Sequence, residues 1–349
     1  MTERTEPVSH RQRDLAAAPP VPTNAVGIGE SFTDPLWRIT VRPSPVEVDL
    51  LRTEPLRRLH FVAHGGASAV STLQSYSRLE HTLGVFALAA HFRPEDEALR
   101  VAALLHDIGH LPLSHTVEGI AGLDHHAIGM RLLRAAPVGP VLDAHGVDLA
   151  DVLAALSGPS ASPLRNGEGL LNLDHLDSFV RSGRDAARLD TDPPALLNRL
   201  ELHGAAVSAD HATAETLIGL VGAEARLHTS WDNVGPVSVV RRLARRLIEG
   251  GAVAPGRLAR MTDAQLWSAF ESLEATRGEA ALLHYEPHRL KVAVGDGAGP
   301  PAAWDFALRK IYRSAPLVGG APLGAAAPGL AAALEELTAL PTVFRVWWE

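Results

Sequence analysis

Apolar residues recur every three or four positions along most of the chain between residues 33 and 250, and glycine and proline interrupt the pattern. That spacing is typical of amphipathic helices that share one core. After residue 280 the pattern changes, because "RLKVAV", "ALRKIYRSAPLV" and "TVFRVWW" read as strands whereas "GLAAALEELTAL" keeps the helical spacing. We therefore predict a mainly α fold, in which a helical core is followed by a small α+β subdomain.

The same pattern divides the chain into three zones. Residues 1–30 are polar and rich in proline and alanine, as expected of a flexible tail. Residues 31–250 form the predicted helical core, and residues 251–349 form a C-terminal subdomain that is first helical and then α+β. Within the core, "SGPSASPLRNGEG" (157–169) has the composition of a surface loop, which we expect to shape the mouth of a site.

One predicted helix of the core carries an unusual set of polar residues, in "ALRVAALLHDIGHLPLSHT". We expect it to begin near Pro94, which suits a first helical turn, and to end soon after His110, because Pro112 stops it. His106, Asp107 and His110 have spacings that allow all three side chains to share one side of this helix. The sequence therefore predicts a polar patch at its C-terminal end.

The preceding helix, in "SRLEHTLGVFALAAHF", places a further histidine on a buried face. Ser77 and Glu80 have the spacing of a capping box, which sets the start of the helix and turns His81 inward. Gly84 lowers helix propensity, which is explained if another helix approaches closely there. The candidate partner is the helix that carries His106.

Composition restricts the chemistry of such a patch. The 349 residues include 17 histidines and no cysteine, so thiolate sites and disulfides are excluded, and a metal would be held by imidazole and carboxylate. The net charge of −8 argues against coating duplex nucleic acid. There is no run of 18 apolar residues and no signal-peptide core, so we expect a soluble cytoplasmic protein without a membrane segment.

A single inward histidine is usually a hydrogen-bonded core residue, and an isolated His-Asp pair carries little information. Here two successive helices present inward imidazoles, and a third helix, in "LLNLDHLDSFVRSGRD", adds Asp174 on an apolar stretch. Burying so many titratable groups without a cation is costly, and a divalent ion compensates that cost. The combination favours a metal site.

Four segments in this order resemble the HD-domain metal-dependent phosphohydrolases: "SRLEHTLGV", "LLHDIGHLPLSHT", "DHHAIG" and "LDHLDSFVR". The resemblance is nearest to the deoxynucleoside triphosphate triphosphohydrolase branch, which includes proteins with SAM and HD domains. The upstream segment "DPLWRITVRPSPVEVDLLRTEPLRRL" is also similar to the entry segment of that branch, so the resemblance covers roughly residues 33–185. It implies a helical HD-domain core and hydrolysis of a phosphate ester or anhydride by metal-activated water.

The resemblance also implies roles for individual residues. The ligands of one divalent metal (Mn, Fe, Zn, Ni, Co or Mg) would be His81, His106, Asp107 and Asp174. Arg78, His110 and His115 match groups that contact phosphate, and His126 matches a histidine of proton transfer. Of the adjacent His125 and His126 at most one is expected to face the site, and we select His126 from its spacing to Gly129. Asp177, one turn after Asp174, is expected to orient a ligand imidazole.

The departures from the family concern the substrate. The glutamate that the family places beside its catalytic histidine is Ala127 here. His64 stands where the branch has a glutamine near the sugar, and Ser178 and Ser182 stand where it has a tyrosine and an aspartate. Since a site discriminates through the hydroxyls that it binds, the changed set indicates a changed substrate. We expect a phosphorylated small molecule, a nucleotide or nucleotide-like compound, and a homo-oligomeric protein.

Two alternatives use the same scaffold. A di-iron HD-domain oxygenase needs two more histidine ligands between Asp107 and Asp174, and the sequence offers five candidates: His110, His115, His125, His126 and His145. A regulatory HD protein that binds a nucleotide without turnover is also compatible with Ala127 and the altered sugar site.

Overall fold

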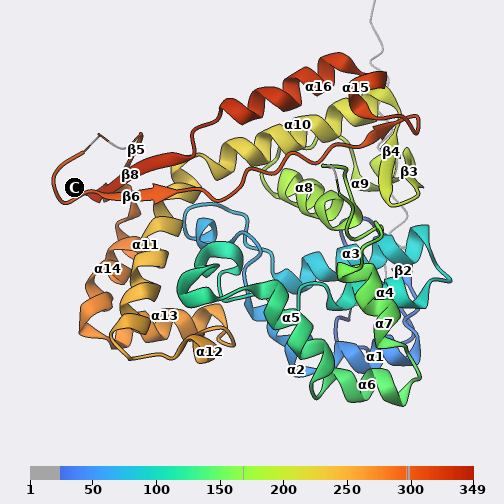
Figure 1. The fold of residues 1–349 in the computed structure, drawn as a ribbon, viewed down its shortest axis with the longest axis horizontal. Helices are drawn as coiled ribbons and strands as arrows, with labels where there is room; N and C mark the ends of the chain where they lie inside the picture. The colour runs from blue at the N-terminus through green and yellow to red at the C-terminus, as the bar shows by residue number, and fades with distance from the viewer. Residues whose placement is uncertain (1–23, 168, 296, 298) are drawn as a thin grey trace, which may run out of the picture.

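The computed structural model describes residues 24–167, 169–295, 297 and 299–349, so most of the predicted tail lies outside the described residues. The fold is mainly α with small sheets, as the sequence predicts (Figure 1). Among the described residues, no helix is both long enough and apolar enough to cross a membrane.

The first half of the chain is almost entirely helical. A short hairpin of β1 (Phe32–Thr33) and β2 (Thr40–Val41) precedes it. The helices are α1 (Pro45–Leu51), α2 (Glu54–Arg58), α3 (Arg78–Phe92), α4 (Glu97–Leu105), α5 (His125–Arg134), α6 (Val138–Ala144), α7 (Leu149–Ser157) and α8 (Leu173–Asp185). Between them lie four 3-10 turns, namely η2 (Leu59–Phe61), η3 (Gly66–Val70), η4 (Ser114–Val117) and η5 (Ile120–Gly122).

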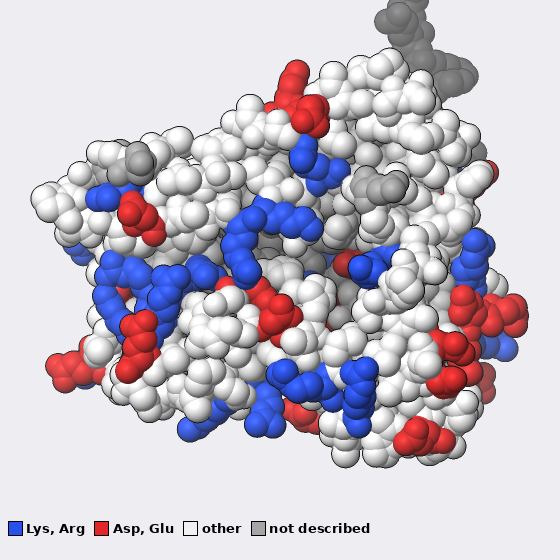
Figure 2. All heavy atoms as spheres, in the orientation of Figure 1, with Lys and Arg blue, Asp and Glu red and all other residues white. Residues whose placement is uncertain are grey.

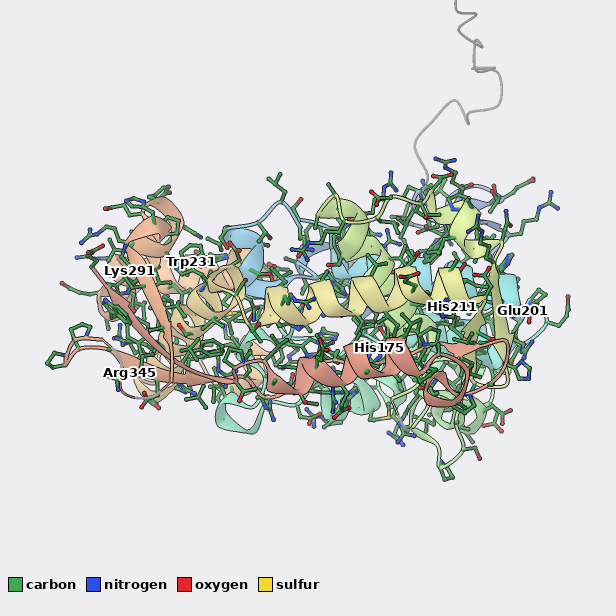
Figure 3. The ribbon with its side chains drawn as sticks, turned by 90° about the horizontal axis from the view of Figure 1, so that it is seen from above. His175, Glu201, His211, Trp231, Lys291 and Arg345 are labelled. Carbon is green, nitrogen blue, oxygen red and sulfur yellow. The ribbon has the colours of Figure 1, made fainter. Side chains whose placement is uncertain are left out.

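The second half adds longer helices and two three-stranded sheets. Its helical elements are α9 (Pro193–Leu197), α10 (His211–His228), α11 (Trp231–Glu249), α12 (Pro255–Leu258), α13 (Asp263–Ser272), α14 (Glu274–Tyr285), η6 (Pro287–Arg289), α15 (Leu323–Ala326), α16 (Pro328–Glu335) and η7 (Glu336–Ala339). Its strands are β3 (Leu200–His203), β4 (Ala206–Ala209), β5 (Leu290–Val294), β6 (Trp304–Ala307), β7 (Leu317–Val318) and β8 (Val343–Trp348). Seen from above, α10 runs from His211 toward Trp231 with α16 alongside it (Figure 3).

Helix α3 lies at the centre of the first core and is buried over most of its length. The predicted capping box is present, since the Ser77 hydroxyl accepts from the Glu80 backbone and the Glu80 carboxylate accepts from the Ser77 backbone. The close approach predicted at Gly84 is made by α8 rather than by the His106 helix. A Cβ at Gly84 would lie 2.0 Å from an oxygen of Asp177 and 2.2 Å from Arg181.

The helix predicted to carry the His-Asp pair is shorter than expected. It begins at Glu97, capped by Asp96, and ends at Leu105, so His106 is its C-cap and Asp107 and His110 lie in the following turn. The prediction of one continuous helical face was therefore wrong. The reason is local, because the backbone nitrogens of Ile108 and His110 bond to carbonyls only three residues back, so the chain tightens into turns instead of continuing the helix.

The predicted C-terminal strands are present in part. β5, β8 and β6 form an antiparallel sheet, whereas "ALRKIYRSAPLV" is extended only at its ends, in β6 and β7. Residues 308–316, which we call the returning segment, leave this sheet and run back to β7, which pairs in parallel with β4 (Figure 1). The C-terminal region thus also closes over the first core.

Candidate metal centre

His81 is fully buried and both of its ring nitrogens are engaged. Its Nδ1 lies 2.8 Å from Asp177 Oδ2, and its Nε2 lies 3.0 Å from Asp174 Oδ1. Asp177 also accepts hydrogen bonds from Trp37 Nε1 and from Arg181, so that carboxylate is fixed in place. The bond from Nδ1–H to Asp177 orients the ring so that Nε2 faces Asp174, in keeping with the orienting role expected of Asp177.

His106 presents its ring in the same way. Its Nδ1 lies 2.8 Å from the Ala103 carbonyl oxygen, to which it donates, so its Nε2 is the nitrogen that faces the centre. The two Nε2 atoms of His81 and His106 are 3.3 Å apart, and His106 Nε2 is 3.8 Å from Asp174 Oδ1. Two imidazole nitrogens and one carboxylate oxygen therefore converge on one point, supplied by α3, by the C-cap of α4 and by α8.

Asp107 closes the fourth side of this group. Its Oδ1 lies 3.5 Å from His106 Nε2 and 3.0 Å from His110 Nε2, and its Oδ2 lies 3.7 Å from His81 Nε2. Arg78 donates to Asp107 Oδ2 at 3.0 Å. The four predicted ligands thus lie together, although they come from three separate segments.

The donor set fits a divalent metal. Ligand atoms about 2.1 Å from one ion stand about 3.0–3.4 Å apart at tetrahedral or octahedral angles. The distances of 3.0 and 3.3 Å from His81 Nε2 to Asp174 and His106 fall in that range. Two imidazole nitrogens that face each other at 3.3 Å cannot both carry a proton, and a cation that replaces the His81 proton would satisfy both. HD domains bind divalent metal, and these residues are the ones that would hold it.

In the protein without metal, a proton on His81 supplies part of the positive charge that the metal would supply. Burial works to lower the pKa of His81, but the hydrogen bonds to Asp174 and Asp177 outweigh it and raise that pKa to about 9. For Asp174 burial opposes ionisation, yet its contacts with His81 and His106 hold the pKa well below its usual range. The centre is therefore built to keep carboxylates ionised around a positive charge.

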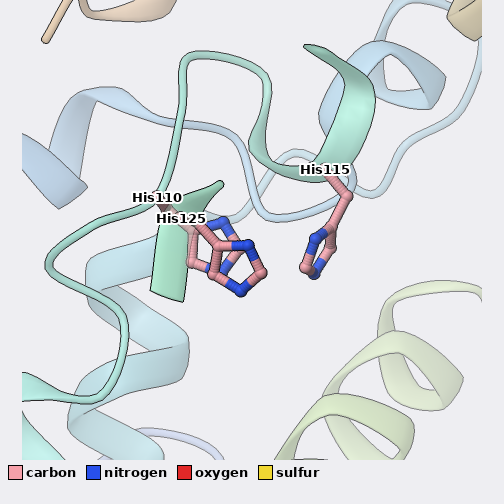
Figure 4. Close-up of side chains that lie close together, drawn as sticks. All are labelled: His110, His115 and His125. Atoms are coloured by element: carbon pink, nitrogen blue, oxygen red, sulfur yellow. The ribbon is translucent and has the colours of Figure 1, made fainter. Parts of the chain in front are cut away.

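A second group of histidines adjoins the first. His110, His115 and His125 each have a ring nitrogen within 4.8 Å of the others, and Figure 4 shows their rings turned toward one space. His110 and His125 stack with centroids 4.4 Å apart, and His115 meets His125 edge-on at 4.9 Å. We call these three residues the histidine cluster.

His110 links the cluster to the metal centre. Its Nε2 contacts Asp107, while its Nδ1 is buried and has no hydrogen-bond partner among the described residues. Burial and the neighbouring Arg78 charge lower the pKa of His110 to about 3, so the ring is neutral. Desolvation, assisted by the positive charges of its neighbours, also lowers the pKa of His115. A buried nitrogen without a partner indicates a place for a ligand.

The structure turns His125 inward, and not His126. His125 is 9 % exposed and belongs to the cluster, whereas His126 is exposed at the surface of α5. The selection of His126 as the inward residue was wrong because α5 begins against Gly109, where a Cβ would lie 2.1 Å from the His125 carbonyl oxygen. That contact orients the first turn of α5 and points His125 at His110.

A carboxylate that sequence reasoning did not consider stands beside His125. Glu118 Oε2 lies 2.9 Å from His125 Nδ1, and Glu118 Oε1 accepts from the His125 backbone at 3.2 Å. The backbone of Glu118 is in turn held by Arg241, which donates to its carbonyl oxygen. Ala127 therefore does not leave the cluster without an acidic partner. The H-x-x-E spacing of His115 and Glu118 in the sequence was the available signal.

The predicted substrate residues lie on two sides of the metal centre. His64 is stacked on Tyr76 and meets the His81 ring edge-on at 4.6 Å. Ser178 is partly exposed on α8, one turn after Asp174. Ser182 is buried, where its hydroxyl donates to Glu224 and accepts from Gln74. The Ser178 hydroxyl takes part in neither of these two hydrogen bonds.

Two residues from distant parts of the chain fix the turn that carries His110 and His115. Arg58 donates to the His110 carbonyl oxygen at 2.7 Å and to the Met261 carbonyl oxygen at 2.6 Å. Asp263 accepts from the backbone of Leu113 at 2.6 Å and of Ala63 at 2.7 Å. No local pattern in the sequence could have connected residue 263 to this turn, because the contact depends on how α13 packs.

Comparison with known proteins agrees with this geometry. Residues 78–155 match the model of the HD domain family. The chain is 27% identical over 249 residues to the metal-dependent phosphohydrolase cns2 of Cordyceps militaris, a match that covers 64% of this chain and 68% of that protein. It is 31% identical over 123 residues to the deoxynucleoside triphosphate triphosphohydrolase SAMHD1 homolog of Dictyostelium discoideum, covering 29% of this chain but only 23% of that protein.

A hypothetical protein from Aquifex aeolicus has a similar fold, with a TM-score of 0.67 at 16% sequence identity over 91% of this chain and 96% of that one. At that identity the likeness concerns the fold alone. Residues 78–155 thus carry an HD domain, and three of the four predicted ligands, His81, His106 and Asp107, lie within it, whereas Asp174 follows it.

Proposed function

We propose that this protein is a metal-dependent phosphohydrolase that cleaves a phosphate ester or anhydride of a nucleotide or nucleotide-like substrate. The observation that carries the proposal is the placement of Arg78 between the metal centre and the histidine cluster. Arg78 is 5 % exposed and donates to Asp107 at 3.0 Å and to Ser114 at 2.8 Å. A buried guanidinium between neutral imidazoles and a cation site suits an anion that must contact both.

Arg78 retains donors for such an anion. A guanidinium has five N–H groups, and the contacts with Asp107, Ser114 and the His64 carbonyl oxygen occupy three of them. His110 and His115 are neutral before the anion arrives, and a bound phosphate would favour their protonated, donating forms. These groups would hold a phosphate with its phosphorus next to His81 and Asp174.

A bound metal would supply Lewis acidity to the phosphate and a water of lowered pKa. The chain supplies the proton transfer. Since His125 Nδ1–H donates to Glu118, its Nε2 faces the cluster and can exchange a proton there. The negative charge of Glu118 stabilises the imidazolium that forms, which allows His125 to return the proton to the leaving oxygen.

The nucleotide part of the proposal rests on the resemblance to relatives whose names describe phosphohydrolases and nucleotide triphosphohydrolases. Ser178 is small, and the Ser182 hydroxyl is already hydrogen-bonded to Glu224 and Gln74. Both differ from the tyrosine and the aspartate that the branch uses around the sugar. We therefore expect a substrate profile unlike that of a standard deoxynucleoside triphosphate triphosphohydrolase.

The test is a panel of nucleotides and phosphate esters, incubated with protein reconstituted with each candidate metal, with products identified by mass. The double variant His106→Ala with Asp107→Ala should lose both metal and hydrolysis while keeping the helical circular-dichroism spectrum. His145→Ala is the matched control, since His145 lies outside the centre and pairs with Asp49. Full metal occupancy in the double variant would refute the ligand assignment, and saturable nucleotide binding without turnover in the wild type would favour the regulatory alternative.

A second candidate function, a di-iron oxygenase, is favoured by the histidine cluster. The cluster could hold a second ion, because the buried Nδ1 of His110 has no partner among the described residues. Two metals per chain with an optical iron signature and oxygen uptake would support it. One metal per chain with release of phosphate would support the phosphohydrolase.

A further inference from the structure

The returning segment crosses the face of the molecule that Figures 1 and 2 present. Figure 2 shows a hollow in this face, and basic side chains lie along the edge that Figure 1 assigns to the segment between β6 and β7. The segment is fixed at both ends, by the bond from the Leu308 backbone to the Thr342 carbonyl oxygen and by the bond from the Ala315 backbone to the Gly169 carbonyl oxygen. The returning segment is therefore anchored to the rest of the molecule at both ends.

Its side chains contact both halves of the site. Arg309 lies against Gly119, next to the Glu118 that binds His125, since a Cβ at Gly119 would be 2.8 Å from the guanidinium. At the other end, the Ser314 hydroxyl lies 2.6 Å from Nδ1 of His175, which directly follows Asp174. The segment thus spans the distance between the histidine cluster and the helix that supplies a metal ligand.

Tyr312 lies between these two ends. Its ring meets His175 edge-on at 5.3 Å and lies 6.0 Å from His228, and the ammonium of Lys310 sits 4.5 Å from its centre. Burial raises the pKa of Tyr312, and the nearby Asp174 carboxylate adds to the rise, so the phenol is a neutral donor. Among the described residues, none forms a hydrogen bond with the Tyr312 hydroxyl.

The position of Tyr312 relative to α8 indicates what it would contact. His175, Ser178 and Ser182 follow one another at helical spacing and share a face of α8. Tyr312 contacts the first of them, His175. His228 and Glu224, the partner of Ser182, lie one turn apart on α10. This is the side on which the relatives' sugar-reading groups have become serines, and it adjoins the metal centre, since the charges of Asp174, Arg78 and Asp107 all act on the pKa of Tyr312.

We propose that Tyr312 is a substrate-positioning residue that contacts the organic half of the substrate, and that the returning segment is the second wall of the site. The inference rests on the proposed function, because it assumes that a phosphate is held at Arg78 and the histidine cluster. An aromatic ring and a donor hydroxyl beside a vacated sugar position are suited to a planar base or to a sugar hydroxyl. Tyr312 would then supply, from a remote part of the chain, the tyrosine that the relatives carry on α8 at the position of Ser178.

The test compares ATP with inorganic tripolyphosphate, which share a phosphate chain and differ in the organic half. With metal-loaded protein, Tyr312→Ala should lower kcat/KM for ATP by about 10-fold to 100-fold, mainly through KM, and change that for tripolyphosphate less than about 2-fold. Tyr312→Phe keeps the ring and should lose about 10-fold on ATP if the hydroxyl donates to the substrate. Arg313→Ala is the matched control, since Arg313 is exposed on the same segment and pairs with Glu335. It should behave as wild type on both compounds.

Equal losses on ATP and tripolyphosphate would overturn the proposal, because Tyr312 would then act on the phosphate site or on the metal centre. Unchanged values for both Tyr312 variants would overturn it as well. A wild-type protein that hydrolyses neither compound would count against the proposed phosphohydrolase and not against Tyr312. In that case the same variants are compared by calorimetric binding of ATP and tripolyphosphate, and an ATP affinity equal to that of the wild type would refute the role of Tyr312.

Discussion

Glu118 holds His125 at two points, with Oε2 2.9 Å from the ring Nδ1 and Oε1 3.2 Å from the backbone nitrogen. The contact directs the other ring nitrogen of His125 toward His110 and His115. It also provides the carboxylate that the sequence lacks at Ala127. Proton transfer in the proposed reaction therefore depends on a pair that is seven residues apart in sequence.

The first prediction compares the two adjacent histidines of α5. His125→Ala should lower turnover by about 10²-fold to 10⁴-fold while leaving metal content unchanged, as loss of a positioned acid or base does. His126→Ala is the matched control because it removes an exposed imidazole from the same helical turn. Steady-state kinetics measures the turnover of both variants, and metal analysis measures their metal content. A large loss in His126→Ala, with His125→Ala near wild type, would contradict the assignment.

The second prediction concerns the pH dependence of metal binding. Because the pKa of His81 in the metal-free protein is raised to about 9, His81 carries a proton at neutral pH and a metal has to displace it. Metal affinity should therefore rise with pH, by about 10-fold per unit, and level off near pH 9. Competition with a chelator at several pH values measures this slope. An affinity that does not change between pH 6.5 and 8.5 would show that His81 is not protonated in the free protein.

The third prediction concerns packing at Gly84. Gly84→Ala places a methyl group where Asp177 and Arg181 now lie, so it should lower Tm and weaken metal binding through the displaced Asp177. Gly219→Ala is the control, since Gly219 is exposed within α10 and a Cβ there has no atom within 4 Å. That substitution should stabilise the protein by up to about 1 kcal/mol through helix propensity. Thermal unfolding of both variants decides, and a Gly84→Ala protein as stable as the wild type would contradict the packing argument.

The fourth prediction concerns specificity at α8. Ser178→Tyr should shift relative kcat/KM toward deoxynucleoside triphosphates, because it restores the group that the relatives carry there. Ser182→Asp should instead lower Tm, since the new carboxylate would face Glu224, which now accepts the Ser182 hydroxyl. A substrate panel and thermal unfolding separate the two effects. A wild-type protein that already prefers deoxynucleoside triphosphates would show that Ser178 does not set specificity.

The sequence was sufficient for the parts of the site that depend on local spacing and on a recognisable motif. The capping box at Ser77 and the inward His81 follow from helical periodicity, and the ligand set follows from the family motif. The direction of His125 did not follow, because it depends on the contact of α5 with Gly109. The proposed role of Tyr312 could not be read either, because its segment is placed beside α8 by two long-range strand pairings, of β6 with β8 and of β7 with β4.

The most direct test of the proposed hydrolysis is a reaction in water labelled with oxygen-18, using the metal-loaded protein and its best substrate from the nucleotide panel. Attack of water at phosphorus predicts one labelled oxygen on the attacked phosphorus, in whichever product keeps it, together with no consumption of dioxygen. Both the product and the label should be absent with the His106→Ala, Asp107→Ala variant. Release of an oxidised product with oxygen uptake, or products without labelled oxygen on any phosphorus, would contradict the account.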